Sequence, residues 1–427
     1  MTPVRVAQIS CGTEYCSIQS LLDDIAERLE IELVYPEIEL SDVSLACSEV
    51  GFEAESPGLN LMIARVTSLL NDKTIKGAIL LTCFKCSEGS IVRDIVRRFL
   101  HERSNIPIIL YSNVEKPKEI ELYSRLEALN TLITRKTLLM REKQKGVTIG
   151  IDSGSSMTKV VVMKDNEIIG KEWLPTTEPV RSADEAMERA AEEAGVLVKE
   201  VDAIGVTGHG SELVSEAVNA RLKLEEVSVV SKGAAMLSGR HKGDATVIDI
   251  GGMNNKLMLM REGIVTSFTF GGICGGSSGR FLEVASHRLD VAITELGALA
   301  TRSEAKAKVG GAREMERGNA KRNKDNMRFD LQSYCMVFGI QSLVVALSSG
   351  ITREDVAAAA CRSVAEQVYE TMIQEIGVRP PVIFVGGVSR VEGVKREFED
   401  MLGVEIIVPP YSQYAGAVGI ATLVSGV

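Results

Sequence analysis

An apolar strand that ends in an aspartate and a turn of small residues occurs twice in this chain, and this repeat restricts the fold more than any other feature. The first copy covers 147–159, where Asp152 follows the apolar segment 147–151. The second copy covers 245–252, where Asp249 occupies the equivalent position, and each copy continues into a hairpin. Two such units that face one another can hold the phosphates and the metal ion of one nucleotide from both sides.

The residues that follow Asp152 have the chemistry of a phosphate site. Gly154 lacks the Cβ that would keep a ligand from the backbone, and Ser155 and Ser156 add hydroxyls beside amides that can point into one concavity. Asp152 can hold a water ligand of Mg²⁺, and Lys159 can offset phosphate charge. For one copy alone, an ordinary glycine hairpin turn is the alternative interpretation.

The second copy predicts the same local structure. Gly251 and Gly252 follow its aspartate, and we expect strands over 256–261 and 264–270 with a turn at 262–263. Finding the pattern twice favours a duplicated phosphate site over two unrelated turns.

A third segment, 381–388, is an apolar strand that ends in Gly386 and Gly387. A flat adenine ring can lie close to the backbone at such a glycine pair. The three segments in this order are far more specific than any one of them.

This ordered set resembles the superfamily of acetate kinase, sugar kinases, heat-shock chaperones and actin, in which two phosphate motifs precede an adenosine motif. Within it, residues 147–425 resemble the ATP-dependent activators of 2-hydroxyacyl-CoA dehydratases, which include the ATPase subunits of benzoyl-CoA reductase. The resemblance implies an α/β fold with a duplicated RNase H-like core of the actin type, ATP and Mg²⁺ as ligands, and a position for Glu226 at the nucleotide cleft. Over its whole length the chain is similar to the methanogenesis marker fifteen family of methanogens.

Two cysteine segments extend the resemblance. The segment 271–282, with Cys274, is similar to the family's cysteine segment at the start of a helix, and 333–338, with Cys335, is similar to the segment of the second ligand. A [4Fe-4S] cluster needs about four thiolates. The resemblance therefore implies a homodimer that holds one cluster per dimer on its two-fold axis. The alternative is that both thiols are buried apolar side chains.

Residues 1–116 are predicted to form a small α/β domain with a parallel sheet. Strands are expected over 5–10 and 77–82, and cysteines follow both of them. Thiols at the carboxyl ends of parallel strands can converge on a second iron–sulfur cluster, while a zinc site, a redox dithiol and inert thiols are the alternatives. The domain is similar to the C-terminal part of the dehydratase subunits that such activators serve. Its candidate residues are Cys11, Cys47, Cys83 and Cys86, with Cys16 beside the first strand.

The rest of the chain divides at Gly146. An amphipathic helix is expected over 117–145, which makes 117–146 a linker and 147–427 a two-lobed activator domain. Within it, 302–328 has the character of an insertion, with nine Lys or Arg against four Asp or Glu. A mobile loop is the default interpretation of such a segment, and a docking surface for an acidic partner is the alternative.

Composition restricts the function further. The net charge of −10 and an aromatic content of 4% argue against a nucleic-acid surface. The N-terminus lacks the pattern of a signal peptide, and we expect no membrane span because no run of about 18 apolar residues occurs. A cytoplasmic protein is expected.

The second phosphate segment departs from the dehydratase activators. Where they continue Gly-Gly-Gln-Asp, this chain has Gly251-Gly-Met-Asn254. Met253 cannot orient a water by hydrogen bonding, and Asn254 brings no charge. The sequence therefore predicts an ATPase that retains ATP binding, while Met253 and Asn254 argue against fast hydrolysis.

The leading functional hypothesis is an ATP-dependent electron-transfer activase. A low-potential donor such as a ferredoxin or flavodoxin would reduce its cluster, and an acceptor metalloenzyme, for instance methyl-coenzyme M reductase in a methanogen, would receive the electron. A small-molecule kinase of the same fold and a non-hydrolysing, nucleotide-dependent interaction protein are the alternatives.

Overall fold

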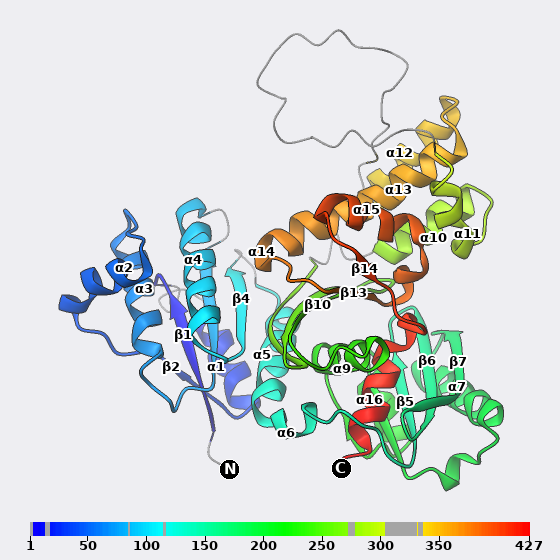
Figure 1. The fold of residues 1–427 in the computed structure, drawn as a ribbon, viewed down its shortest axis with the longest axis horizontal. Coiled ribbons are helices and arrows are strands. Elements are labelled where there is room, and N and C mark those ends of the chain that lie inside the picture. The colour runs from blue at the N-terminus through cyan, green and yellow to red at the C-terminus, as the bar shows by residue number, and fades with distance from the viewer. Residues whose placement is uncertain are drawn as a thin grey trace.

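The computed structural model describes residues 3–12, 18–83, 86–113, 117–271, 278–303, 331 and 336–427. Their strands form one sheet of nine strands and one of five (Figure 1). We call the unit around the five-stranded sheet, 147–223, lobe 1. Lobe 2 is the unit around β10 to β14, within 244–407. No helix among the described residues is long and apolar enough to cross a bilayer.

The two lobes repeat one topology. Lobe 1 has the strand order β7-β6-β5-β8-β9, and lobe 2 has the order β12-β11-β10-β13-β14. In lobe 1 the strands β5, β6 and β7 form an antiparallel meander, and β8 and β9 run parallel to β5. In lobe 2 the strands β10, β11 and β12 do the same, and β13 and β14 run parallel to β10. The strands are β5 Val147–Ser153, β6 Met157–Lys164, β7 Glu167–Pro175, β8 Ala203–Thr207, β9 Leu222–Lys223, β10 Asp244–Ile250, β11 Asn255–Arg261, β12 Ile264–Phe270, β13 Val382–Val385 and β14 Ile406–Ile407. The predicted duplicated core is confirmed.

The repeat extends to local irregularities. The β6–β7 turn has two residues with positive φ, Asp165 and Asn166, and the β11–β12 turn has Glu262 and Gly263 in the same conformation. Paired left-handed residues match the twist of a hairpin. The predicted turn at 262–263 is therefore confirmed.

The N-terminal domain extends the sheet of lobe 2. Its four strands are parallel, in the order β4-β3-β1-β2, and β4 pairs in parallel with β12 through Ser267 with Ile108 and Phe268 with Ile109. Its elements are β1 Val4–Ser10, α1 Ile18–Arg28, β2 Ile31–Val34, α2 Val43–Val50, α3 Pro57–Leu69, β3 Gly77–Cys83, α4 Ser87–Arg103 and β4 Ile108–Asn113. The predicted parallel sheet is confirmed, but its continuity with lobe 2 was not predicted.

The direction of this pairing sets the position of the site. Because β12 is parallel to β4 and β10 is parallel to β12, the strands β13, β10, β12, β4, β3 and β1 all end at one edge of the nine-stranded sheet. We call this edge the carboxyl edge. Gly386, Asp249, Cys83 and Cys11 all lie at it or next to it.

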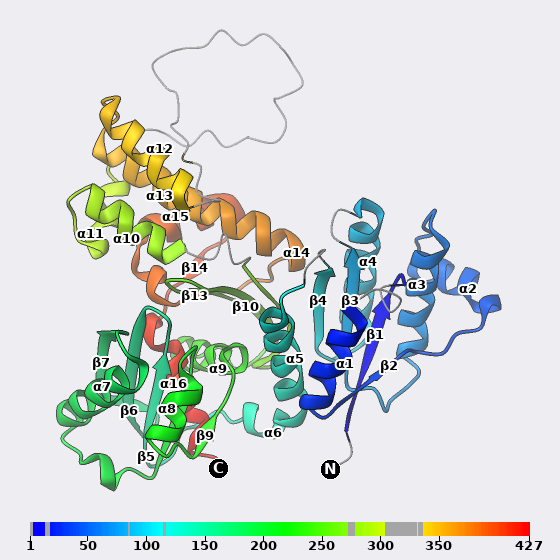
Figure 2. The same cartoon turned by 180° about the vertical axis from the view of Figure 1, so that it is seen from behind.

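The linker folds as two helices instead of one. α5 covers Glu119–Thr134, and after a break at Arg135 the short α6 covers Lys136–Leu139. α5 packs against α1 of the N-terminal domain and against α9, Glu226–Ser238 (Figure 2). It therefore lies between the N-terminal sheet and the ATPase core.

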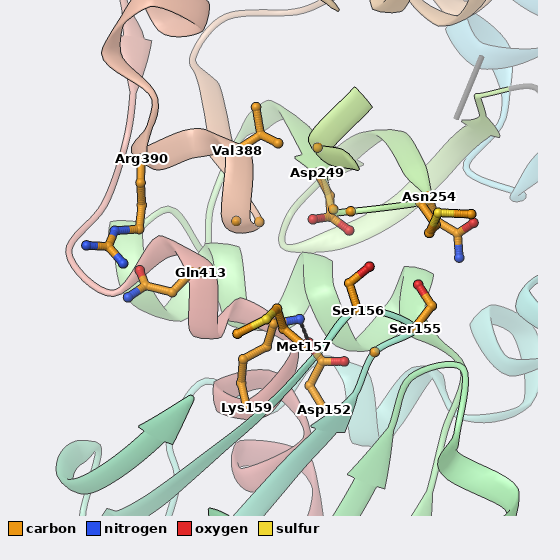
Figure 3. A pocket seen from close by; sticks show the side chains of 18 of the residues that line it. Asp152, Ser155, Ser156, Met157, Lys159, Asp249, Asn254, Val388, Arg390 and Gln413 are labelled. Atoms are coloured by element: carbon orange, nitrogen blue, oxygen red, sulfur yellow. Dashed lines mark hydrogen bonds and ion pairs between the residues drawn. The ribbon is translucent and has the colours of Figure 1, made fainter. Parts of the chain in front are cut away.

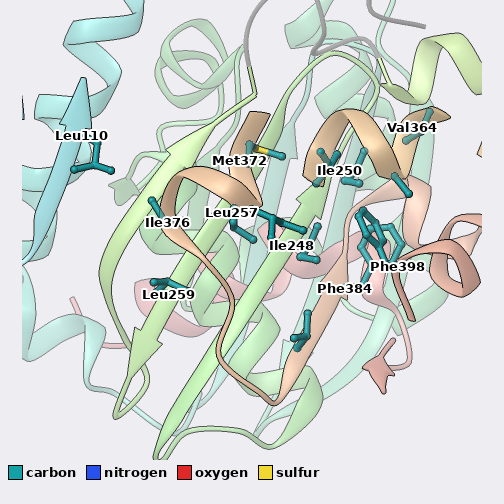
Figure 4. Packing of buried hydrophobic residues seen from close by; sticks show 14 of the residues in the cluster. Leu110, Ile248, Ile250, Leu257, Leu259, Val364, Met372, Ile376, Phe384 and Phe398 are labelled. Atoms are coloured by element: carbon teal, nitrogen blue, oxygen red, sulfur yellow. The ribbon is translucent and has the colours of Figure 1, made fainter. Parts of the chain in front are cut away.

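One apolar core continues from the N-terminal domain into lobe 2. Leu110 of β4 belongs to the same buried cluster as Ile248 of β10 and Leu257 of β11 (Figure 4). Within it, the rings of Phe384 and Phe398 meet edge to face, with 5.4 Å between their centres. Helices of lobe 2 cover this face: α10 Ser278–Arg288, α11 Ile293–Ala300, α12 Met336–Ser348, α13 Arg353–Val368 and α15 Glu392–Leu402.

The lobes meet where α9 crosses α16, Ala415–Val424. A Cβ on Gly233 of α9 would overlap the carbonyl oxygen of Ala415, and one on Gly419 would overlap that of Val229. These two glycines allow the helix backbones to approach closely.

The β4–β12 pairing generates a stability prediction. Phe268→Ala removes a ring that is 2% exposed and packs in the same cluster as its neighbour Ile109. We expect the free energy of unfolding to fall by about 3–5 kcal/mol. Amide exchange should accelerate in β4 as well as in β12. Leu213→Ala, at a side chain that is 58% exposed, is the control and should change stability by less than about 0.5 kcal/mol. Unchanged exchange in β4 would contradict the pairing.

Candidate nucleotide site

The two phosphate segments form matching turns at the ends of β5 and β10. The amide of Gly154 donates to the carbonyl of Met157 at 3.2 Å, and the amide of Gly251 donates to that of Asn254 at 3.0 Å. Each donor lies two residues after the aspartate and each acceptor five residues after it. The turns face each other, because a Cβ on Gly252 would overlap the Ser156 hydroxyl (Figure 3).

Each aspartate is paired with a lysine across its hairpin. Asp152 is the register partner of Lys159, whose Nζ lies 3.1 Å from its Oδ2. Asp249 is the register partner of Lys256, at 3.2 Å. Sequence reasoning identified Lys159 but missed Lys256. Lys256 could have been found from the repeat, because the lysine follows the aspartate by seven residues in both copies.

The second pair is part of a buried group of three charges. Lys256, 5% exposed, also forms an ion pair with Glu226 at the start of α9. Burial opposes the charge on Glu226, yet the Lys256 ammonium outweighs that effect and lowers the pKa of Glu226. Burial likewise disfavours the Lys256 charge, but the two carboxylates raise its pKa. Glu226 and Lys256 are therefore both ionised at neutral pH.

At Asp152, in contrast to Glu226, the effect of burial on the pKa outweighs the effect of the nearby lysine. Burial raises the pKa of Asp152, and the Lys159 ammonium offsets only part of that effect, while Glu226 and Asp249 raise it further. An Mg²⁺ ion would supply the missing positive charge. The described residues contain no group of three acidic, His or Cys side chains arranged as a metal cage. Mg²⁺ usually takes one or two carboxylates together with phosphates and waters, and Asp152 and Asp249 at the two turns could supply these carboxylates.

A cavity of about 450 Å³ lies between the lobes and joins all three predicted motifs. Its size suits a small-molecule ligand. Its lining includes the predicted residues Asp152, Gly154, Ser155, Ser156, Lys159, Glu226, Asp249, Gly251, Gly252, Gly386 and Gly387. The structure thus brings together every residue that the sequence analysis assigned to nucleotide binding.

The far end of the cavity contains residues that the sequence did not indicate. Arg390, just after the adenosine motif, lies over the ring of Trp173 on β7, with 5.2 Å between the guanidinium carbon and the ring centre. Gln413 lines the same region. Arg390 and Trp173 belong to different lobes, so no local pattern could have connected them.

The second phosphate turn contacts the start of α10 directly. The carbonyl of Gly252 accepts a hydrogen bond from the Arg280 amide at 3.0 Å, and a Cβ on Gly279 would overlap the carbonyl oxygen of Gly251. The first turn of α10 is therefore packed on the backbone that would hold a phosphate.

A buried chain of hydrogen bonds reinforces this contact. Asn255, at the start of β11, donates from Nδ2 to the Ser278 hydroxyl at 2.7 Å, and that hydroxyl lies 3.3 Å from Gln367 Oε1 on α13. All three side chains are at most 3% exposed. A shift of the phosphate turn would therefore change hydrogen bonds at the starts of α10 and β11 together.

The cysteines predicted to bind the bridging cluster, Cys274 and Cys335, lie outside the described residues. The helices that follow them are described. α10 begins at Ser278 and α12 at Met336, and these two helices pack against each other. Most of the predicted insertion at 302–328 also lies outside the described residues.

Three of the N-terminal cysteines gather at the carboxyl edge. Cys11 follows β1 and Cys83 ends the neighbouring strand β3, and both Cys83 and Cys86 are near enough for their charges to affect Cys11. Cys47 lies in α2, 5% exposed, within the apolar core. Cys16 is outside the described residues.

The fold and the cleft define a two-lobed nucleotide-binding protein of the actin-like ATPase class. Residues 149–424 match the BadF/BadG/BcrA/BcrD ATPase family. The chain belongs to this family, which confirms the resemblance to the dehydratase activators.

Individual relatives agree with this assignment. The protein MJ0800 of Methanocaldococcus jannaschii is 44% identical over 424 residues, 99% of this chain and 97% of the relative. The (R)-2-hydroxyglutaryl-CoA dehydratase activating ATPase of Acidaminococcus fermentans is 31% identical over 64% of this chain and 95% of its own length. Among solved structures, the activator of 2-hydroxyisocaproyl-CoA dehydratase from Clostridium difficile with bound ADPNP is similar with a TM-score of 0.55 and 27% identity, over 66% of this chain and 94% of that one.

The buried charge group generates a prediction with a defined pH dependence. Lys256→Met leaves Glu226 and Asp249 without their shared cation, and we expect a loss of about 3–5 kcal/mol in unfolding free energy at neutral pH. Because Lys256 lowers the pKa of Glu226, the stability from this pair is present above the ordinary glutamate pKa and is lost as pH falls. The deficit of the variant should therefore shrink below about pH 4.

Denaturant unfolding at several pH values measures this effect. Lys223→Met is the matched control, because Lys223 pairs with Glu212 at the surface. Such a pair contributes about 0–1 kcal/mol. A deficit for Lys256→Met that stays constant with pH would contradict the charge assignment.

Proposed function

We propose that this protein is an ATP-dependent electron-transfer activase, a homodimer whose Cys274 and Cys335 hold one [4Fe-4S] cluster between the two chains. The observation that carries the proposal is the contact between the second phosphate turn and the first turn of α10. The segment that contains Cys274 connects β12 to α10, so it is attached directly to a helix that lines the nucleotide cavity with Gly279, Leu282 and Glu283. A cluster bound there would supply a one-electron carrier.

The donor set suits such a cluster. Two cysteines per chain cannot provide about four thiolates, and two chains can. α12, which follows Cys335, exposes three apolar side chains: Phe338, Val344 and Val345. An apolar surface beside the second cysteine supports the proposal that a second copy packs at this end of lobe 2.

The nucleotide acts through the protein's own contacts. Phosphates held between the turns at Gly154 and Gly251 would draw the lobes together. Movement of the second turn is transmitted by the Gly252–Arg280 hydrogen bond to α10, and by Asn255 to Ser278. For a one-electron carrier, about 59 mV corresponds to roughly 1.4 kcal/mol, so a bias of a few kcal/mol shifts the potential substantially.

Turnover is expected to be slow. Met253 lines the cavity and is 47% exposed, in the position where a polar side chain could orient water toward a phosphate. ATP would then act chiefly by binding, with hydrolysis limiting its release. This feature also favours the second candidate function, a nucleotide-dependent interaction protein without electron transfer.

The partners are proposed by analogy with the relatives. Activators named for dehydratases, and a component of the benzoyl-CoA reductase of Thauera aromatica, are relatives of this chain. A ferredoxin or flavodoxin is the proposed donor, and a metalloenzyme the proposed acceptor. The similarity to a Methanocaldococcus protein over nearly the full length supports a methanogen setting, in which methyl-coenzyme M reductase is a candidate acceptor.

Anaerobic purification tests the cluster assignment. A shared cluster predicts about two irons and two sulfides per chain, together with a dimeric mass. Cys274→Ala should lose the iron and the visible absorption, and it should still bind ATP. Binding can be followed by the fluorescence of Trp173, the single tryptophan. A Cys274→Ala protein that retains the full cluster absorption would refute the ligation, and a colourless wild type that binds ATP would favour the interaction protein.

The coupling path has its own test. Ser278→Ala removes the hydroxyl between Asn255 and Gln367, and we expect ATP affinity to change less than threefold. The ATP-induced shift in cluster potential should fall by at least half. Ser286→Ala is the matched control, because the Ser286 hydroxyl on the same helix bonds only locally, to the Glu283 carbonyl. An undiminished potential shift in Ser278→Ala would exclude this path.

A further inference from the structure

We propose that Cys11, Cys83 and Cys86 form a redox-active thiol site that reduces a low-molecular-weight disulfide. The site belongs to the N-terminal domain and does not depend on the function proposed for the nucleotide cleft. Thiol–disulfide exchange uses an attacking thiolate and a second thiol close enough to resolve the mixed disulfide, and cysteines at neighbouring strand ends can supply both.

The sheet brings Cys11 and Cys83 together. β1 and β3 are neighbouring parallel strands, with Ser10 paired to Leu81, so Cys11 leaves β1 beside the last residues of β3. Cys83 is the final residue of β3 and is near enough for its charge to affect Cys11. Continuing the register from Ser10 and Leu81 sets Cys11 opposite Thr82, one residue before Cys83. Because neighbouring strands are about 4.8 Å apart, this offset leaves the two cysteines near the Cα separation that a disulfide spans.

Cys86 is anchored to Cys83 and to the start of α4. The Cys86 amide donates a hydrogen bond to the Cys83 carbonyl at 3.3 Å. Its sulfur then accepts a hydrogen bond from the Gly89 amide at 3.2 Å, in the first turn of the 17-residue helix α4. A Cβ on Gly89 would lie 2.9 Å from that sulfur, so glycine leaves room for it.

The solvent exposure of the three cysteines indicates which thiol attacks the substrate and which one resolves the mixed disulfide. Cys83 is exposed and can attack a dissolved disulfide, whereas Cys11 and Cys86 are partly covered. Burial, together with the nearby Cys83 and Cys86, raises the pKa of Cys11 to about 11. Cys11 therefore carries its proton at neutral pH and suits the role of resolving thiol better than that of attacking thiol.

The exchange balances without another reagent. The Cys83 thiolate attacks one sulfur of the disulfide, forms a mixed disulfide and releases one thiol. Cys11 loses its proton and attacks the Cys83 sulfur, which forms the Cys11–Cys83 disulfide and releases the second thiol. Two electrons pass from the protein to the substrate disulfide. A thiol of lower potential must reduce the protein again.

The surroundings hold the site rigid. Arg93 of α4 donates to the Thr82 hydroxyl at 3.3 Å and to the Ser112 hydroxyl at 2.5 Å, and it lies 3.8 Å from Glu375 of lobe 2. These contacts fix α4, and with it Cys86, against the ends of β3 and β4.

The test uses the full-length protein, reduced and kept anaerobic, with 2-hydroxyethyl disulfide as the probe. We expect about two equivalents of 2-mercaptoethanol per chain and a disulfide mapped by peptide mass spectrometry to Cys11 and Cys83. Cys83→Ser should lower the rate of this release at least tenfold. Cys11→Ser should slow release of the second equivalent, with a mixed disulfide at Cys83 accumulating.

Cys47→Ser and Cys361→Ser are the matched controls, because both thiols are buried, and they should leave the release unchanged. Circular dichroism verifies the fold of each variant. A stable adduct at Cys83 in the wild type, with one equivalent released, would overturn the proposal. So would iron or zinc that is bound to the wild type and lost from a Cys11→Ser, Cys83→Ser double variant, since the thiols would then be metal ligands.

Discussion

The ion pair between each phosphate-turn aspartate and the lysine across its hairpin is the interaction on which the cleft depends. Asp152 and Asp249 approach each other from opposite lobes, with Glu226 close by, and three carboxylates in so little space repel one another. Lys159 and Lys256 reduce that repulsion from within each hairpin, since cross-strand partners lie on one face of a sheet. The turns can thus face each other before any ligand arrives. Lys159 offsets only part of the burial effect at Asp152, which makes Asp152 a carboxylate that a metal ion would stabilise.

The same hairpins connect the cleft to the rest of lobe 2. β11 begins with Asn255, which bonds to α10, and β12 leads out toward the segment with Cys274. The outer strand β12 also receives β4, so the core of lobe 2 continues into the N-terminal domain. Binding, coupling and domain attachment therefore share three consecutive strands.

Sequence patterns predicted the local parts of this arrangement well. The spacing of Asp, Gly and Ser residues is local chemistry, and it located both turns, their hairpins and the glycine pair of the adenosine motif. Contacts between distant segments were not accessible in this way. Arg390 and Trp173 meet across the cleft, and β4 joins β12 through two residue pairs that have no special composition.

Lys256 could have been predicted from the sequence. It lies seven residues after Asp249, as Lys159 lies seven residues after Asp152, so an alignment of the two copies would have identified it. The linker was predicted as one helix over 117–145. The structure confirms a helix over 119–134, but the chain breaks at Arg135 and only a short second helix, Lys136–Leu139, follows. The chain must turn there to enter β5, and tertiary packing decides where a helix stops.

The strand addition at β12 has a mechanical consequence. Because nine strands form one hydrogen-bonded sheet, any rotation of lobe 2 carries the N-terminal domain with it as a single rigid block. Lobe 1, which is linked to that block chiefly through α9, α16 and the linker, is then the smaller moving part. Cys83 and Gly251 lie at the carboxyl edge of this one sheet, so a rotation of lobe 1 relative to the sheet would leave their separation unchanged.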